Sequence, residues 1–392
     1  MTYLSPEAMR EARKFMAADQ QGVRDEIGFL SIHQRYADRF FPGTSVLHTR
    51  LRHVLFVPWL YRDEQLKPAS SRSTRDSIKD REYRLTGRLK GESGVIGSRN
   101  YPEPVEQRPS QVYWGALQQW GILRGHDGSG PLSRYQVERL VTGKRSTLLK
   151  DEEGRPLSTA AWPFACPEAP NEWARDGEGT LTFRLLKTER TFLAKRLRSL
   201  TSPDNPGEKS VLAQLVGEDI AGTRTAWGRQ VLQLAGKERP VLVRAGQAAA
   251  LAAIGRAIYA AQVETLQERD GTPPSRIQRS ALPTVVSRWA EQAAKLEWSG
   301  FCEDVKHLPV AVSEALRLTL DWLKRGATDP MELEPMYRDA EQYRKGRRAR
   351  LSNTQFAVDL RTEWTSAEHP QAQPLHYRWD RIQMLLADLV GA

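Results

Sequence analysis

Cysteine is nearly absent from this sequence, with Cys166 and Cys302 the two examples in 392 residues. Two thiols exclude a disulfide framework and a four-thiolate zinc site, and they predict cysteines that stay reduced. Runs of 18 apolar residues are also missing, which argues against a membrane-spanning helix. The first residues lack the apolar stretch of a secretory signal. These absences predict a cytoplasmic protein with no membrane partner.

The sequence motifs of common catalytic sites are missing as well. There is no GxxxxGK[ST] phosphate loop, no strand-linked GxGxxG and no GxSxG elbow for a catalytic serine. No histidine precedes a lysine by two positions, as phospholipase-D-type nucleases require. His126-Asp127-Gly128-Ser129-Gly130 joins three catalytic residue types, but its glycines favour a turn. His48 and His53 are five residues apart, a poor spacing for two metal ligands on one helix. We therefore predict no catalytic residue, no metal and no cofactor.

Acidic residues are fewer than basic ones: 48 Asp and Glu stand against 58 Lys and Arg, a formal net charge of +10. The resulting isoelectric point of about 9.6 permits an acidic partner such as nucleic acid, without requiring one. The apolar fraction of 40% is ordinary for a globular protein and excludes a mainly disordered chain. The length allows two or three domains.

Helical spacing of apolar residues recurs along most of the sequence and predicts a mainly α fold with minor strand content. One alternating segment, Leu181–Leu185, is typical of a strand. The predicted helices begin near Ser5, Ser110 and Ser133 and cover 31–41, 245–263, 283–296, 310–324, 334–348 and 378–389. We place one helical domain at residues 1–150, a linker at 151–179 and a second helical domain at 180–392. The first domain carries a charged surface insertion at about 62–108, with one helix in it.

Two of these helices meet at Pro42-Gly43 in an arrangement similar to a helix-turn-helix. The second helix would be capped by Thr44 or Ser45 and would carry Thr49, Arg50 and Arg52, which are donors able to reach phosphates or base edges. An ordinary packed helical hairpin is the alternative, with the arginines solvated or paired with Asp38 and Asp63.

A basic cluster near the end of another predicted helix is the second candidate site. Five of its seven residues are positive and none is acidic: Arg344, Lys345, Arg347, Arg348 and Arg350. Neutralisation of several phosphates would make binding strongly salt-dependent. A solvated helix end, favoured by the helix dipole, is the alternative.

Several short motifs, in order along nearly the whole chain, resemble a bacterial family known only as a domain of unknown function. They are Phe40-Phe41-Pro42-Gly43-Thr44-Ser45, Thr49-Arg50, Val57-Pro58-Trp59, Ile96-Gly97, Pro109-Ser110, Tyr113-Trp114, Gly121-Ile122, Trp364 and Tyr377-Arg378-Trp379. Where relatives carry a Leu-Tyr-Asn-like core helix, this chain has Ile258-Tyr259-Ala260-Ala261, so no role of that asparagine is carried over. The resemblance implies a place in bacterial defence gene neighbourhoods, beside helicases and phospholipase-D-like nucleases.

The leading hypothesis is therefore a non-enzymatic, DNA-binding accessory subunit of a bacterial anti-phage system. It would bind double-stranded DNA through Thr49, Arg50, Arg52 and the basic cluster, and would position a partner helicase or nuclease. Two alternatives stay open. One is an assembly subunit that has no contact with nucleic acid, and the other is a metal-dependent nuclease with a carboxylate cluster that has no recognisable motif.

Overall fold

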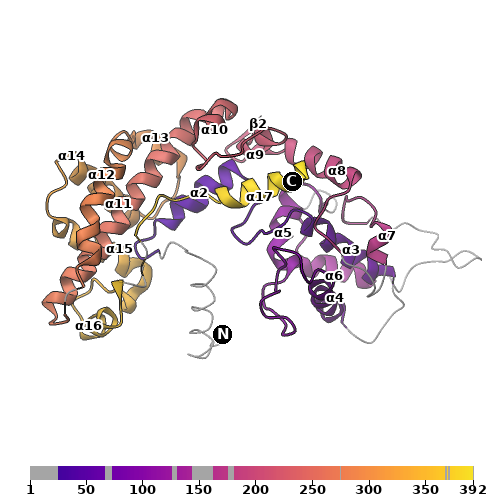
Figure 1. Cartoon of the computed structure of the whole chain (residues 1–392), viewed down its shortest axis with the longest axis horizontal. Coiled ribbons are helices and arrows are strands. Elements are labelled where there is room, and N and C mark those ends of the chain that lie inside the picture. Colours follow the sequence, from indigo (N-terminus) through magenta and orange to yellow (C-terminus); the bar gives the residue numbers. More distant parts are fainter. Residues whose placement is uncertain are drawn as a thin grey trace, which may run out of the picture. The chain divides into compact units, whose positions relative to one another are not determined.

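A computed structural model gives the fold (Figure 1), and it describes residues 25–66, 73–125, 130–143, 162–174, 181–273, 275–366, 369 and 371–391. The predicted fold class is confirmed, since helices dominate and the described part has one small sheet. That sheet pairs β1 (Thr201–Ser202) with β2 (Asn205–Lys209) in antiparallel register, with Thr201 opposite Lys209. The predicted helix near Ser5, the turn at 126–129 and much of the predicted linker lie outside the described residues.

The chain folds into two compact units, and each is built from separate stretches of sequence. Unit 1 consists of residues 1–36, 225–232 and 239–377, and unit 2 of residues 37–224, 233–238 and 378–392. These units do not coincide with the predicted domains at 1–150 and 180–392. The boundaries of independently folding domains stay a prediction.

Unit 1 is organised around one long helix, α11 (Arg239–Arg269). Alanine, the best helix former, is abundant in it, and the helix is buried on nearly every side. The helices packed with it, labelled in Figure 1, are α12 (Ile277–Ala294), α13 (Trp298–Asp304), α14 (Val310–Lys324), α15 (Glu334–Lys345) and α16 (Gln355–Thr362). The short 3-10 helix η2 (Pro330–Leu333) contacts α11 as well, and η3 (Gly346–Arg348) packs against α15 and α16.

Two glycines let aromatic rings reach the backbone of α11. A side chain at Gly246 would meet the indole of Trp227 at 2.7 Å, and one at Gly255 would meet the ring of Phe29 at 2.6 Å. The span 236–269 is long and apolar enough to cross a membrane, but 78% of its most apolar window is buried inside the fold. This burial is what the central helix of a packed core shows.

Buried polar side chains fix the C-terminal end of α11 to its neighbours. The Glu264 carboxylate accepts hydrogen bonds from the backbone N–H groups of Gln278 and Arg279, at 2.9 and 2.7 Å, and so caps the start of α12. Gln267 donates to the carbonyls of Arg361 and Trp364. The segment that follows α16 is thereby held against α11.

Unit 2 packs its helices around α3 (His53–Leu66), which is buried from His53 through Tyr61 in spite of the internal Pro58. The other helices of unit 2 are α4 (Thr74–Arg88), α5 (Pro109–Gln119), α6 (Arg134–Gly143), α7 (Asn171–Ala174), α8 (Lys187–Arg198), α9 (Val211–Leu215), η1 (Gly236–Glu238) and α17 (Trp379–Val390). Two helices, α2 (Leu30–Phe40) and α10 (Arg229–Leu234), have residues in both units.

Two local predictions need correction. The segment Leu181–Leu185 forms no strand, because its polar groups bond to side chains: the Thr182 carbonyl accepts from Arg52 and the Phe183 N–H donates to Glu92. The strands lie instead at 201–209, where the sequence does not alternate. The charged insertion does contain one helix, α4, but Ile78 and Leu85 are buried on it, so it is part of the core as well as of the surface.

Candidate nucleic-acid interface

The predicted helix-turn-helix is not formed. Helix α2 ends at Phe40 and α3 begins at His53, so residues 41–52 form a connection without a helix. The Tyr113 hydroxyl accepts from the backbone N–H groups of Thr49 and Arg50 and donates to the Arg50 carbonyl. Because this one side chain satisfies three backbone groups at residues 49 and 50, these residues have no need of the hydrogen bonds of a helix.

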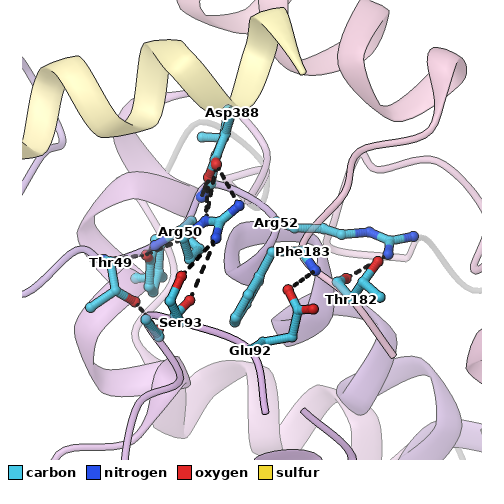
Figure 2. A network of polar contacts seen from close by, with 11 residues as sticks. Thr49, Arg50, Arg52, Glu92, Ser93, Thr182, Phe183 and Asp388 are labelled. Atoms are coloured by element: carbon cyan, nitrogen blue, oxygen red, sulfur yellow. Dashed lines mark hydrogen bonds and ion pairs between the residues drawn. The ribbon is translucent and has the colours of Figure 1, made fainter. Parts of the chain in front are cut away.

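Figure 2 shows how Thr49 and Arg50 are held in unit 2. The Thr49 hydroxyl donates to the Gly94 carbonyl at 2.5 Å. The Arg50 guanidinium pairs with Asp388 of α17, at 2.8 Å between Nη2 and Oδ1, and stacks over the ring of Phe183. The Asp388 carboxylate also accepts the Leu51 N–H at 2.7 Å. Arg50 and Leu51 therefore connect α17 to the rest of unit 2.

Arg52 has no exposed surface at all. Its guanidinium pairs with Glu189 of α8 at 2.8 Å and with Glu172 of α7 at 2.7 Å, and it donates to the Thr182 carbonyl. The predicted role of Arg52 as a DNA contact has to be corrected, since a group without exposed atoms cannot touch a phosphate in this conformation. The acids expected to pair with these arginines are used elsewhere: Asp38 pairs with Arg378 and Asp63 with Arg81.

The basic cluster at 344–350 is divided by the fold into paired and unpaired charges. Arg344 pairs with Asp25 at 2.9 Å, and both Lys345 and Arg350 pair with Glu26. Burial raises the pKa of Asp25, and the Arg344 charge acts in the opposite direction. Arg347 and Arg348 in η3 are exposed and form no ion pair with any described residue.

A pocket of about 400 Å³ in unit 1 is lined by one of these two arginines, Arg347, together with Gln342, Gly346, Ser352, Thr354 and Phe356. Phe356, which lines the pocket, is 45% exposed, and Tyr343, near the C-terminal end of α15, is 72% exposed. We call this the η3 surface: Tyr343, Arg347, Arg348, Phe356 and the pocket. It brings together positive charge and aromatic rings, the two features that bind nucleic-acid backbones and bases.

The backbone behind the η3 surface is firmly anchored. The buried Glu341 carboxylate accepts hydrogen bonds from the Tyr259 hydroxyl, at 2.6 Å, and from the Leu351 N–H, at 2.8 Å. Arg361 donates to the carbonyls of Arg350 and Ser352 and pairs with Asp270 at 2.6 Å. The pocket wall is thus tied to α11 and α15.

The histidines of unit 2 have packing roles. His48 stacks on Tyr113, with ring centroids 4.2 Å apart, and a ring nitrogen lies 3.2 Å from the Val112 carbonyl oxygen. Burial lowers the pKa of His48 to about 4 and that of His53 to about 3. Within the described ranges no group of three or more His, Cys, Asp or Glu side chains could hold a metal ion.

Sequence reasoning missed a second basic surface, on α8 in unit 2. The side chains of Lys187, Lys195 and Arg198 are exposed on it, and those of Arg190 and Arg196 are half-buried. The one acid in the helix, Glu189, faces inward to Arg52. The signal is present in the sequence, because bases at 187, 190, 195 and 198 lie on one face while the acid lies off it.

Comparison with known proteins reaches only the first part of the chain. Residues 1–152 match the model of a family of unknown function (DUF6361). This range confirms the coarser part of the predicted resemblance, a likeness to a family without known function. The motifs from Phe40 to Ile122 fall inside it, whereas Trp364 and Tyr377-Arg378-Trp379 fall beyond it. No curated protein and no solved structure matches the chain.

Proposed function

We propose that this protein is a non-enzymatic DNA-binding subunit that contacts DNA through the η3 surface of unit 1. One observation carries the proposal: Arg347 and Arg348 are exposed and have no acidic partner among the described residues, while the neighbouring Arg344, Lys345 and Arg350 pair with Asp25 and Glu26. Two free guanidinium groups on a firmly held turn suit phosphate oxygens.

The aromatic rings beside these arginines add a second kind of contact. Stacking of a base on an exposed aromatic ring is worth about 1–3 kcal/mol, and it needs bases that are free of a duplex. Tyr343 and Phe356 therefore favour binding of single-stranded or opened segments, in addition to the double-stranded DNA expected from the sequence. The partners proposed for this subunit are a helicase or nuclease of an anti-phage system, and that context rests on the family resemblance alone.

The test is fluorescence anisotropy with labelled single- and double-stranded DNA of one sequence, titrated from about 50 to 200 mM salt. The change is the double variant Arg347→Ala/Arg348→Ala. Loss of two phosphate contacts makes the negative slope of log K against log salt shallower by about 1.4–1.8. Tyr343→Ala, in contrast, weakens binding of the single strand by about tenfold and leaves the salt slope unchanged, because it removes stacking and no charge.

Matched controls separate local contact from net charge. Arg317→Ala/Arg325→Ala removes the same charge from unit 1, but from arginines paired with Asp321 and Glu332. We expect this variant to have the same slope of log K against log salt as the wild type. Tyr135→Ala removes an equally exposed ring from unit 2. Equal slopes for the wild type and the Arg347/Arg348 variant would remove the η3 surface from the proposal, and absence of binding at low salt would end the DNA proposal altogether.

A second candidate function, assembly with a partner protein, is favoured by a separate observation in unit 2: the basic face of α8 borders a partly apolar pocket. A metal-dependent nuclease has no ligand cluster to support it in the described part of the chain.

A further inference from the structure

A pocket of about 330 Å³ lies between α8 and the end of α17 in unit 2. Helix α8 contributes Arg190, Thr191, Ala194, Lys195 and Arg198, and the opposite wall consists of Val216, Gly217, Leu389 and Val390. The α8 residues recur at intervals of three or four and therefore form one face of the helix. We call this the α8 pocket. It shares no residue with the η3 surface, which lies in unit 1.

The polar side of the α8 pocket is positive and has no acidic partner in the part of the chain that the structure describes. Arg190, Lys195 and Arg198 form no ion pair with any described residue, and Arg190 Nε is buried without a hydrogen-bond acceptor there. Glu218 and Asp219 follow Gly217 and are exposed, yet neither pairs with α8 within the described segments. A ligand that brings carboxylates would therefore meet positive charges that no described acid pairs with.

Two glycines fix where those arginines lie. The Arg198 guanidinium lies against Gly217, where an added Cβ would be 2.8 Å from Nη2, and it donates to the Val216 carbonyl. The Arg190 guanidinium lies against Gly391 in the same way, at 2.5 Å. Both glycines have positive φ, +93° and +84°, so a larger residue would be strained in its backbone and would also push the arginine away. Arg190 and Arg198, which both line the pocket, are thereby packed against the backbone at Gly391 and Gly217.

The other wall of the α8 pocket is apolar. Val390 is 66% exposed, and Leu389 and Val216 lie beside it. A DNA backbone gains little from aliphatic side chains, whereas a protein segment uses such a wall to bury an anchor residue. The volume is within the range of about 300–1,000 Å³ in which proteins bind ligands. Charge and shape together fit a segment that carries both carboxylates and a large apolar side chain.

We infer that the α8 pocket is a docking site for an acidic, apolar-anchored segment of a partner protein. The anchor side chain lies against Val216, Leu389 and Val390, and the flanking carboxylates pair with Arg190, Lys195 and Arg198. This inference is independent of the proposed DNA contact, because it rests on other residues in the other unit.

The experiment uses the full chain and a fluorescent synthetic peptide in which glutamates flank leucines. Two companion peptides replace either the glutamates by glutamines or the leucines by alanines, and labelled single-stranded DNA serves as the phosphate probe. We expect saturable binding of the first peptide and binding at least about tenfold weaker for each companion, because each lacks half of the match.

Variants localise that binding. The double variant Lys195→Glu/Arg198→Glu should weaken binding of the acidic leucine peptide by about tenfold or more, since two attractive pairs become repulsive. Val390→Asp should also weaken peptide binding, because it places a charge on the apolar wall of the pocket. Lys187→Glu is the matched control, because it reverses a charge on the same helix outside the pocket, and it should change binding less than about twofold.

Three results would overturn the inference: absence of saturable binding by the acidic leucine peptide, equal binding of the peptide without leucines, or equal loss with Lys187→Glu. If DNA binding, and not peptide binding, responds to Lys195→Glu/Arg198→Glu, the surface is a phosphate contact and the inference is wrong. If the η3 variants bind DNA like the wild type, the peptide-binding result is unaffected. The two proposals can therefore fail independently of each other.

Discussion

At the scale of single residues, a guanidinium group without exposed atoms has to be matched by negative charge. Arg52 meets this condition with Glu189, which is 1% exposed, and with Glu172. Removal of one partner of a buried ion pair costs about 3–5 kcal/mol, because the other charge stays buried and unpaired. We expect Arg52→Ala to lower the free energy of unfolding by about this amount, measured by urea denaturation followed by tryptophan fluorescence.

The control for Arg52 is an arginine of the same sequence-predicted DNA-binding set that lies on the surface. Arg348→Ala should change stability by less than about 0.5 kcal/mol, as is usual for exposed positions. If Arg52→Ala kept wild-type stability and yet lost DNA affinity, Arg52 would be a DNA contact after all. Its assignment as a buried ion-pair partner that stabilises the fold would then be wrong.

Buried neutral histidines predict a pH dependence of stability. Burial lowers the pKa of His53 to about 3, whereas an unfolded histidine has a pKa of about 6.5. Between these values the unfolded chain binds a proton that the folded chain does not. Stability is therefore fully present above pH 6.5 and falls as the pH drops below it, by about 1 kcal/mol per pH unit for this one group.

His53→Phe should remove that contribution, since phenylalanine suits a site surrounded by the rings of Phe56, Tyr113 and Phe183. Denaturation curves between pH 7 and 4.5 should show a shallower decline for this variant than for the wild type. His307→Gln, at an exposed position, should retain the wild-type decline. A variant His53→Phe with an unchanged decline would show that His53 is protonated equally in both states.

The arginines also show what cannot be predicted from the sequence. Arg50, Arg52, Arg347 and Arg348 are the same residue type, each in a basic stretch, and were predicted alike as DNA contacts. What separates them is the position of acids that are distant in sequence: Asp388 is 338 residues from Arg50 and Glu189 is 137 residues from Arg52. Long-range ion pairs of this kind leave no local pattern, so only the fold reveals which arginines are free.

At the scale of elements, predictions based on local periodicity agree closely with the structure. The helix predicted over 310–324 is α14 to the residue, and the helix predicted over 334–348 is α15 continued by η3. Amphipathic helices succeed because their apolar face is encoded every three or four residues. The core helix predicted at 245–263 is real but shorter than α11, since its polar ends carry capping and tethering roles that hydrophobicity does not report.

Connections between elements were predicted less well. The stretch 41–52 contains a Pro-Gly turn followed by cap residues, which favours a helix locally. The N–H groups of Thr49 and Arg50 bond instead to the Tyr113 hydroxyl, and that of Leu51 bonds to Asp388. The segment 181–185 alternates like a strand, but no strand among the described residues pairs with it. In both cases a tertiary contact overrides the local preference, because hydrogen bonds can be satisfied equally well by a distant partner.

At the scale of the whole molecule, the family match and the folded unit have different boundaries. The match ends at residue 152, whereas unit 2 includes residues up to 224 and the stretch 378–392. Three of the acids that neutralise Arg50 and Arg52 lie beyond the match: Glu172, Glu189 and Asp388. Phe183 and Trp173, which pack on the α3 rings, lie beyond it as well.

A fragment of residues 1–152 is therefore expected not to fold by itself. Without α7, α8 and α17, the helix α3 would expose apolar side chains that are fully covered in the full chain, and Arg52 would lose both of its carboxylates. Thermal unfolding of this fragment, followed by circular dichroism, should show no cooperative transition.

As a control, the folded full chain is cut at a protease site introduced between residues 150 and 162. Its two pieces should elute together in gel filtration, because the contacts of unit 2 join both sides of the cut. A cooperative transition in the fragment alone would show that residues 1–152 form a domain that does not need the rest of unit 2.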